Sequence, residues 1–136
     1  MLNTPAKISE DRASRLLGLK WLRHKDTKKA VAEIKADQRP DGGWAQLPNL
    51  SSDAYATGQA LYALHEGGGM PVNDPIYQKG VKFLLRNQDE DGSWFVNKRA
   101  IPANNYFDGG FPHGQSQYSS FNGSCWALMA LLETIK

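Results

Sequence analysis

The chain has 136 residues, of which 40% are hydrophobic and 22% are charged, as expected for a globular domain with its own core. Sixteen basic against 14 acidic residues leave a net charge of +2, which is too weak to indicate a nucleic-acid partner. No run of the sequence is long and apolar enough to predict a transmembrane segment, and the segment 1–20 has no signal-peptide core. A cytoplasmic location is expected if the chain is full length, and the compartment stays open if it is part of a longer protein.

Taken in chain order, the sequence predicts five helices and gives no strong strand signal. Apolar residues spaced three or four apart indicate each helix, and Asp, Ser or Thr before such a run indicates its start. Asp74 followed by Pro75 is typical of a helix start, and Gly67-Gly68-Gly69 is typical of a helix end. The expected helices cover about 10–24, Asp26 or Thr27 to about Gln38, Ser52 or Asp53 to Gly67, Asp74 to about Asn87, and Ser119 or Ser120 onward.

The last predicted helix carries an apolar stripe at steps of four and three positions, the spacing of one helix face. Cys125 lies on this stripe, so we expect a buried and unreactive thiol. It is the only cysteine of the chain, which excludes an internal disulfide. The stripe consists of Phe121, Cys125, Leu128, Leu132 and Ile135.

An internal repeat organises the chain. The segments 38–44 and 88–94 both read Gln-x-x-Asp-Gly-x-Trp, and their numbering differs by 50. A second match, between 60–64 and 127–131, has the larger offset of 67, so an insertion lies between Trp94 and the last helix. We name 38–44 the first Trp turn and 88–94 the second Trp turn. Their shared residues are Gln38, Asp41, Gly42, Trp44, Gln88, Asp91, Gly92 and Trp94.

The residue types of the Trp turns predict a structural role for them. The Gln amide can bond free backbone groups at the end of the preceding helix. The Asp-Gly pair favours a tight turn in which Gly takes a positive φ. The Trp ring is a large apolar anchor that holds the turn against a neighbouring helix. Each Trp turn is therefore expected to join successive helical hairpins.

Small and charged residues separate the helices into two layers. The third and fifth helices are rich in Ala and Gly, which allow close approach between inner helices, whereas the second and fourth carry more Lys and Arg, which suits an outer layer. The order inner, outer, inner, outer, inner makes two and a half hairpins. We expect an arc of helices that does not close into a ring.

The two Trp turns and the helices before them resemble the QW motif of terpenoid cyclases. The segment 79–94 matches the motif at every position, and the segment 29–44 matches it except at Glu33. The resemblance to squalene-hopene cyclases and to protein prenyltransferases covers residues 27–136 and extends to the first helix. It implies an all-α fold, a partial α/α toroid of about five helices in one domain over residues 1–136.

The resemblance does not extend to the catalytic residues of these families. Squalene-hopene cyclases protonate an alkene with an Asp-x-Asp-Asp motif, which this chain lacks. Prenyltransferases bind zinc through Asp, Cys and His at the starts of inner helices, where this chain has Ser52, Ala54 and Gly123. None of these three side chains is a usual zinc ligand. His24, His65 and His113 follow no metal-binding spacing. We therefore expect no metal and no cofactor.

Residues 95–118 form a long connection that is rich in aromatic residues. Connections beyond roughly 12–15 residues are usually functional or disordered, and disordered segments are poor in aromatics. A lid over a binding site and a wrap over a helix edge both remain open, and the wrap is favoured. Asp53 is expected to cap its helix, and Tyr55 lies beside it on the inner layer. The candidate ligand-binding residues are Asp53, Tyr55, Tyr106, Phe107, Asp108, Phe111, His113 and Tyr118.

Three hypotheses of function follow, and catalytic residues stay unknown in all of them. The first is a non-catalytic repeat module that binds a protein partner or an apolar, isoprenoid-like ligand, with self-association or docking to parent-chain domains. The second is a fragment of a terpenoid cyclase or prenyltransferase without its catalytic half. The third is a lyase or hydrolase on an α/α scaffold that uses the loop at 104–118.

Overall fold

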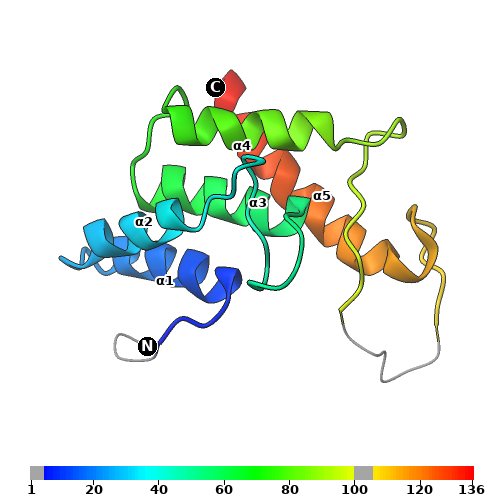
Figure 1. The fold of residues 1–136 in the computed structure, drawn as a ribbon, viewed down its shortest axis with the longest axis horizontal. Coiled ribbons are helices and arrows are strands. Elements are labelled where there is room, and N and C mark those ends of the chain that lie inside the picture. Colours follow the sequence, from blue (N-terminus) through cyan, green and yellow to red (C-terminus); the bar gives the residue numbers. More distant parts are fainter. Residues whose placement is uncertain (1–4, 100–105) are drawn as a thin grey trace.

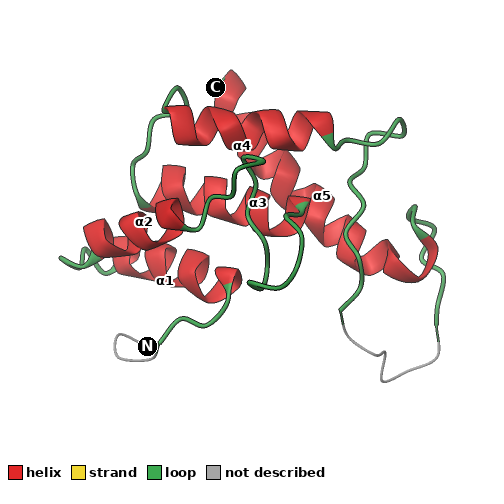
Figure 2. Ribbon diagram, in the orientation of Figure 1, coloured by secondary structure: helices red, strands yellow, loops and turns green. Residues whose placement is uncertain are grey.

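A computed structural model describes residues 5–99 and 106–136. Within this part of the chain all regular elements are helices, and the only β-type pairing is an isolated bridge between Trp44 and Asp53 (Figure 2). The all-helical fold class predicted from the sequence is therefore confirmed. The elements are α1 (Ser9–Trp21), α2 (Thr27–Ala36), α3 (Ala54–Tyr62) continued by the π-helical turn η1 (Ala63–Gly67), α4 (Pro75–Arg86), the 3-10 turn η2 (Gly114–Ser116), α5 (Gln117–Leu132) and the 3-10 turn η3 (Glu133–Ile135).

Helix α3 lies at the centre of the arrangement and contacts α1, α4 and α5 (Figure 1). Its packing against α5 is the most extensive of all, and α1 packs against α2 and η1. Helix α3 consists of small and apolar residues without a charge, and seven of its nine residues are buried. Helices α1, α3 and α5 thus form an inner layer and α2 and α4 an outer one, the order expected from the sequence.

The two tryptophans occupy equivalent positions in the two Trp turns. Each side chain is 1% exposed. The indole nitrogen of Trp44 donates to the Ile34 carbonyl at 2.7 Å, and that of Trp94 donates to the Leu84 carbonyl at 2.8 Å. Each indole therefore fixes the end of the outer helix that precedes its turn.

The hydrogen bonds inside the Trp turns also repeat. Gln38 donates from its amide to the Gly42 carbonyl, and Gln88 does so to the Gly92 carbonyl, both at 2.9 Å. The backbone φ is +90° at Gly42 and +84° at Gly92, a region that L side chains rarely adopt. These bonds confirm the predicted roles of Gln and Gly in the turns.

The inner helices repeat in register, with Thr57 of α3 equivalent to Ser124 of α5. The backbone N–H of Trp44 donates to the Thr57 hydroxyl, and that of Trp94 donates to the Ser124 hydroxyl, both at 3.0 Å. Between the two helices, a Cβ on Gly58 would lie 2.5 Å from the backbone of Trp126. The small residues therefore permit the close approach of α3 and α5, as predicted.

Two expectations for α5 are wrong. The helix begins at Gln117, after Ser116, rather than at a cap formed by Ser119 or Ser120. The Ser120 hydroxyl instead accepts the backbone N–H of Val96 at 3.0 Å, so it holds the connection that runs past the helix start. Cys125 is exposed rather than buried. The buried face of α5 is made of small residues, which let α3 approach and leave the larger apolar side chains on the opposite face.

Helices α1 and α2 end at Trp21 and Ala36, short of the expected ends near residue 24 and Gln38, because Arg23 takes a positive φ and the first Trp turn begins at Gln38. The predicted aspartate caps agree with one exception. Asp53 caps α3 by accepting the Ala56 N–H at 2.8 Å, and Asp74 caps α4 by accepting the Ile76 N–H at 2.8 Å. Asp26 occupies the cap position of α2 without a side-chain cap bond. No helix in the described residues is long and apolar enough to cross a lipid bilayer.

Tyr77 ties α4 to the end of α5. It is fully buried, and its hydroxyl donates to the Ala130 carbonyl at 2.7 Å. Burial, and after it the charges of Glu133 and Glu66, raise the pKa of Tyr77 to about 12. The phenol thus stays neutral in the folded chain over a range in which a free tyrosine ionises.

We predict that Trp94→Ala lowers the free energy of unfolding by roughly 3–5 kcal/mol, because it empties a buried aromatic site and leaves the Leu84 carbonyl without its donor. Urea denaturation measures the change. Trp21→Ala is the matched control, since Trp21 is 81% exposed and should change stability by less than about 0.5 kcal/mol. Similar values for both variants would contradict the assigned role of Trp94.

A second prediction concerns alkaline pH. Because the unfolded chain ionises Tyr77 near pH 10 and the folded chain near pH 12, the contribution of Tyr77 is complete below pH 10 and is lost as pH rises to 12. The unfolding free energy of the wild type should therefore fall more steeply over this range than that of Tyr77→Phe. Urea melts at a series of pH values test this, and parallel curves for the two proteins would refute it.

Candidate functional site

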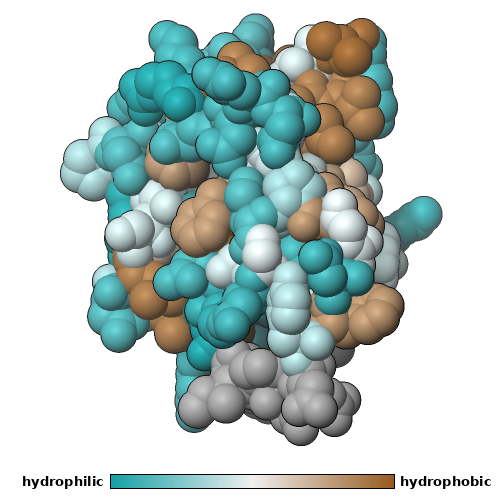
Figure 3. Space-filling model, turned by 90° about the vertical axis from the view of Figure 1, so that its right-hand side faces the viewer, coloured by the Kyte–Doolittle hydropathy of each residue, from teal (hydrophilic) through white to brown (hydrophobic). Residues whose placement is uncertain are grey.

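One face of α5 exposes a row of apolar side chains in the described part of the chain. We call the residues Phe121, Cys125, Leu128, Leu132 and Ile135 the exposed α5 stripe. Phe121 and Leu128 are each 49% exposed, Leu132 is 51% exposed and Ile135 is 78% exposed. Helix α5 contains no charged residue. In the space-filling view, apolar residues gather along one side of the molecule (Figure 3).

The equivalent face of α3 shows how such a surface is covered within this chain. In the register that pairs α3 with α5, Leu128 corresponds to Leu61 and Cys125 corresponds to Gly58. Leu61 is fully buried, and a Cβ on Gly80 of α4 would lie 2.7 Å from its side chain. The equivalent face of α3 is therefore covered by the outer helix α4 and the inner helix α5, whereas the face on α5 is open.

Asp53 lies at the start of α3 and is half-buried. Besides capping the helix, its carboxylate accepts a hydrogen bond from the Gln46 amide at 2.6 Å. Burial raises the pKa of Asp53, and the hydrogen bonds from Ala56 and Gln46 oppose this shift. These contacts account for the carboxylate structurally, as a cap.

Tyr55, beside Asp53, lines a hollow of about 220 Å³ between the starts of α3 and α5. Burial raises the pKa of its phenol, and the charge of Glu10 adds to the shift. Arg99 also lines the hollow, which makes it a polar site with one cation rather than an apolar pocket. The lining residues are Gln46, Tyr55, Val96, Asn97, Arg99, Ser119 and Asn122.

Gln117 organises the described part of the aromatic connection; residues 100–105 lie outside the described residues. Gln117 is 1% exposed. Its oxygen accepts the Gly109 N–H at 2.5 Å, and its amide donates to the Tyr106 hydroxyl at 2.7 Å and to the Gly114 carbonyl at 3.0 Å. Gln117 is not predictable as a site residue from the sequence, because a Gln at a helix start carries no distinctive signal.

Aromatic residues of this connection cluster around its contact with α5. The Tyr118 hydroxyl donates to the Phe107 carbonyl at 2.9 Å. Phe111 meets Phe121 edge to face, with ring centroids 5.4 Å apart. Asp108 accepts the Gly110 N–H at 2.9 Å. Six predicted site residues therefore lie in one segment near the start of α5: Tyr106, Phe107, Asp108, Phe111, His113 and Tyr118.

His113 joins this segment to the second Trp turn. Its Nε2 lies 3.1 Å from an oxygen of Asp89. In the first Trp turn the residue equivalent to Asp89 is Arg39, whose guanidinium donates to the carbonyls of Leu50 and Pro48. Arg39 and Asp89 thus each hold the connection that leads to the next inner helix. Arg39 does so by donating to backbone carbonyls, and Asp89 does so by contacting the His113 imidazole.

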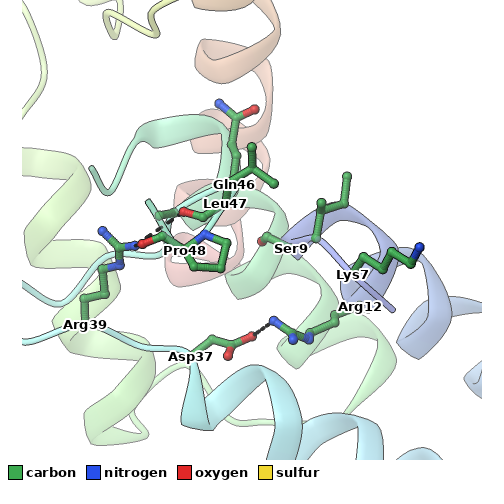
Figure 4. Close-up of a pocket in the computed structure, with 10 residues that line it drawn as sticks. Lys7, Ser9, Arg12, Asp37, Arg39, Gln46, Leu47 and Pro48 are labelled. Atoms are coloured by element: carbon green, nitrogen blue, oxygen red, sulfur yellow. Dashed lines mark hydrogen bonds and ion pairs between the residues drawn. The ribbon is translucent and has the colours of Figure 1, made fainter. Parts of the chain in front are cut away.

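A second hollow, of about 240 Å³, lies between the start of α1 and the first Trp turn (Figure 4). Three of its charged side chains, those of Arg12, Asp37 and Arg39, already have partners inside the chain. Arg12 forms an ion pair with Asp37, and Arg39 points to the carbonyls of the 47–50 connection. No residue of this hollow was predicted as a site, and its contacts explain it as the joint between α1 and the first repeat.

We predict that Asp53→Ala costs about 1 kcal/mol of stability through loss of the helix cap, and that Asp53→Asn costs less. Asn keeps an acceptor for the Ala56 N–H and removes the charge that burial disfavours. Urea denaturation of both variants compares the costs. Equal losses would contradict this prediction and would show that the negative charge itself stabilises the start of α3.

Comparison with known proteins places this geometry in a family. The model of the squalene-hopene cyclase C-terminal domain matches residues 10–136. Lanosterol synthase ERG7 of Saccharomyces cerevisiae is 34% identical over 103 residues, which are 76% of this chain and 13% of that protein. The squalene–hopene cyclase of Zymomonas mobilis is 32% identical over 123 residues, which are 77% of this chain and 17% of that protein.

A third relative, lanosterol synthase erg7A of Aspergillus fumigatus, is 33% identical over 105 residues, 77% of this chain and 13% of that protein. The chain spans less than a fifth of the length of each of these relatives. The match of the family model covers both Trp turns and all five α-helices but the first residue of α1. By its sequence, its repeated turns and its helical layers, the chain belongs to the squalene-hopene cyclase C-terminal domain family.

Proposed function

We propose that this chain is a non-catalytic repeat module that binds a protein partner through the exposed α5 stripe. The partner supplies a further helical hairpin of the same repeat class. One observation carries the proposal: the face of α3 that is equivalent to the stripe is covered at Gly58 and Leu61 by such a hairpin, formed by α4 and α5. Because the α4–α5 hairpin covers this face on α3, a similar hairpin is the partner expected for the same face on α5.

The contacts on α3 specify what the partner must carry. Leu61 fits beneath Gly80 of the outer helix, and Gly58 fits against the backbone of the inner helix at Trp126 and Ala127. By equivalence, the partner's outer helix needs a small residue above Leu128. Its inner helix needs a small face where it meets Cys125. These are the residue types found at the same motif positions of this chain.

The apolar character of the exposed α5 stripe supports a role in binding a partner. Monomeric proteins rarely expose contiguous apolar surface larger than a few hundred Å², and larger patches mark interaction sites. The exposed α5 stripe runs along the full helix and continues to Ile135. Helix α5 has no charged residue. An apolar partner would therefore not have to desolvate a charge when it covers the stripe.

The second candidate is a cyclase segment that acts only together with other parts of the ring. The relatives favour it, since they are lanosterol synthases and a squalene–hopene cyclase. Two features support the non-catalytic proposal for the chain by itself. Its sequence contains no Asp-x-Asp-Asp motif. An arc of five helices also leaves a polyene exposed to water, and cationic intermediates need shielding from it.

We predict that Leu128→Glu reduces the self-association and dye binding of the purified chain and leaves its stability within about 0.5 kcal/mol of the wild type. Light scattering measures the molar mass, and anilinonaphthalene sulfonate fluorescence measures the exposed apolar surface. Leu85→Glu is the matched control, because Leu85 is 56% exposed but lies on α4. Equal effects of the two substitutions would contradict a specific role for the stripe.

The nature of the partner is tested by appending a second copy of the α4–α5 hairpin after Lys136. A hairpin that docks on the stripe should raise the melting temperature and lower dye fluorescence. The control appends the same hairpin with Gly80→Leu in the added copy, which closes the seat for Leu128. Unchanged dye fluorescence with both additions would refute the proposal. Conversion of squalene to a cyclic product by the chain alone would favour the cyclase candidate.

A further inference from the structure

Three metal-ligating side chains meet at the far ends of the inner helices, away from the Trp turns and the aromatic connection. His65 and Glu66 come from the π-helical turn η1, and Glu133 comes from the start of η3. One ligand atom from each of them lies within 4.8 Å of the others. Glu66 and Glu133 are equivalent residues in the register that pairs α3 with α5. The repeat itself therefore brings the two carboxylates together.

The backbone fixes the tautomer of His65. Its Nδ1 lies 2.7 Å from the carbonyl oxygen of Met70, so Nδ1 carries the proton that this hydrogen bond needs. Nε2 then presents its lone pair when the ring is neutral. A histidine that binds a metal is usually oriented in this way, with its other nitrogen donating to a carbonyl or carboxylate.

Glu133 is held in the same manner. Its side chain is 6% exposed, and one carboxylate oxygen, Oε1, accepts from Lys136 Nζ at 2.6 Å. The other oxygen, Oε2, faces His65 Nε2 at 3.5 Å. Each of these two ligands thus has one atom bound by the protein and a second atom directed to a common point.

The separations fit a shared ion better than direct hydrogen bonds. Nε2 of His65 is 3.5 Å from Glu133 and 4.0 Å from Oε1 of Glu66, both longer than the usual reach of a nitrogen–oxygen hydrogen bond. Ligand bonds of about 2.0–2.2 Å at tetrahedral angles put neighbouring ligand atoms about 3.4 Å apart. The ligand atoms of His65 and Glu133 are already at about this separation. Glu66, whose side chain is 45% exposed, has to move closer by roughly 0.6 Å to His65 to complete the set.

We propose that His65, Glu66 and Glu133 form a binding site for a divalent zinc ion. One imidazole and two carboxylates are ligands that zinc accepts, and three protein ligands leave a fourth position for water. The proposal departs from the expectation of no metal, which rested on spacing in the sequence. Ligands at positions 65, 66 and 133 follow no zinc-binding spacing, and they meet only because the two helix ends are adjacent.

The helix geometry at the site supports this assignment. The turn η1 replaces the α-helical bonds by wider ones, as in the bond from the Gly68 N–H to the Ala63 carbonyl at 3.1 Å. Such π-helical turns occur frequently at functional sites. The equivalent end of α5 also departs from α geometry, in the 3-10 turn η3. Both helices are thus modified where they deliver ligands.

Titration of the chain with zinc chloride at pH 7.5 tests the proposal, since the imidazole must be neutral to bind. Isothermal titration calorimetry should show one saturable site, and zinc should raise the melting temperature in a way that a chelator reverses. Glu66→Gln and His65→Gln should each weaken binding by at least roughly tenfold. Glu66 is 45% exposed in its side chain, so its substitution leaves the fold intact.

The matched control is His24→Gln, because His24 Nδ1 lies 3.6 Å from Asp26 but has a single carboxylate beside it. This variant should bind zinc as the wild type does. Cobalt in place of zinc should give visible absorption bands that His65→Gln removes. The proposal is overturned if no saturable binding occurs up to about 100 micromolar zinc, which corresponds to a binding free energy of only about −5.5 kcal/mol. Equal binding by His65→Gln would overturn it too, and leave His65 and Glu133 as a simple ion pair.

Discussion

The hydrogen bonds of the two tryptophans are the constraint on which the arc of helices depends. Each tryptophan donates from its indole to the end of an outer helix and from its backbone to a hydroxyl of the following inner helix. Two polar groups of one buried residue therefore fix two helices relative to each other. An alanine cannot replace the first of these bonds, and a proline cannot replace the second. Because the second Trp turn repeats the arrangement of the first, the angle between successive hairpins is set twice in the same way, and the curvature of the chain follows from a single local unit.

Sequence reasoning predicted the repeated unit well because its residues act locally. Many bonds of Gln, Asp-Gly and Trp lie within one turn or reach the helix directly before it, so a short motif contains much of the information. The same reasoning failed for α5, since helical spacing shows that a face is apolar but not which face is covered. The small residues around Gly123 and Ala127 are the ones that α3 buries. Periodicity therefore placed Cys125 on the wrong side of the core.

The candidate sites were less predictable, and the reason is their long-range geometry. His113 is among the site residues predicted from the sequence, but its partner Asp89 in the second Trp turn is not. The repeat gives no hint of this pair, because the residue equivalent to Asp89 in the first Trp turn is Arg39. Gln117 was not predicted, because its role depends on three hydrogen bonds to residues that lie 3 to 11 positions away in the sequence. His65 follows no metal-binding spacing in the sequence, although the carboxylate of Glu133 lies 3.5 Å from it in space. Pairing across repeats is visible only once the helices are placed.

The uncharged surface of α5 also determines how association through it responds to conditions. Coulomb attraction between exposed charges weakens as salt is added, but burial of apolar side chains does not depend on such screening. Excluded salts such as sulfate strengthen effective apolar burial, and cooling weakens it. Complexes formed by the leucines of this helix should accordingly tighten in ammonium sulfate and loosen in the cold. Purification at low temperature and low ionic strength would then separate the chain from the partner proposed for this surface.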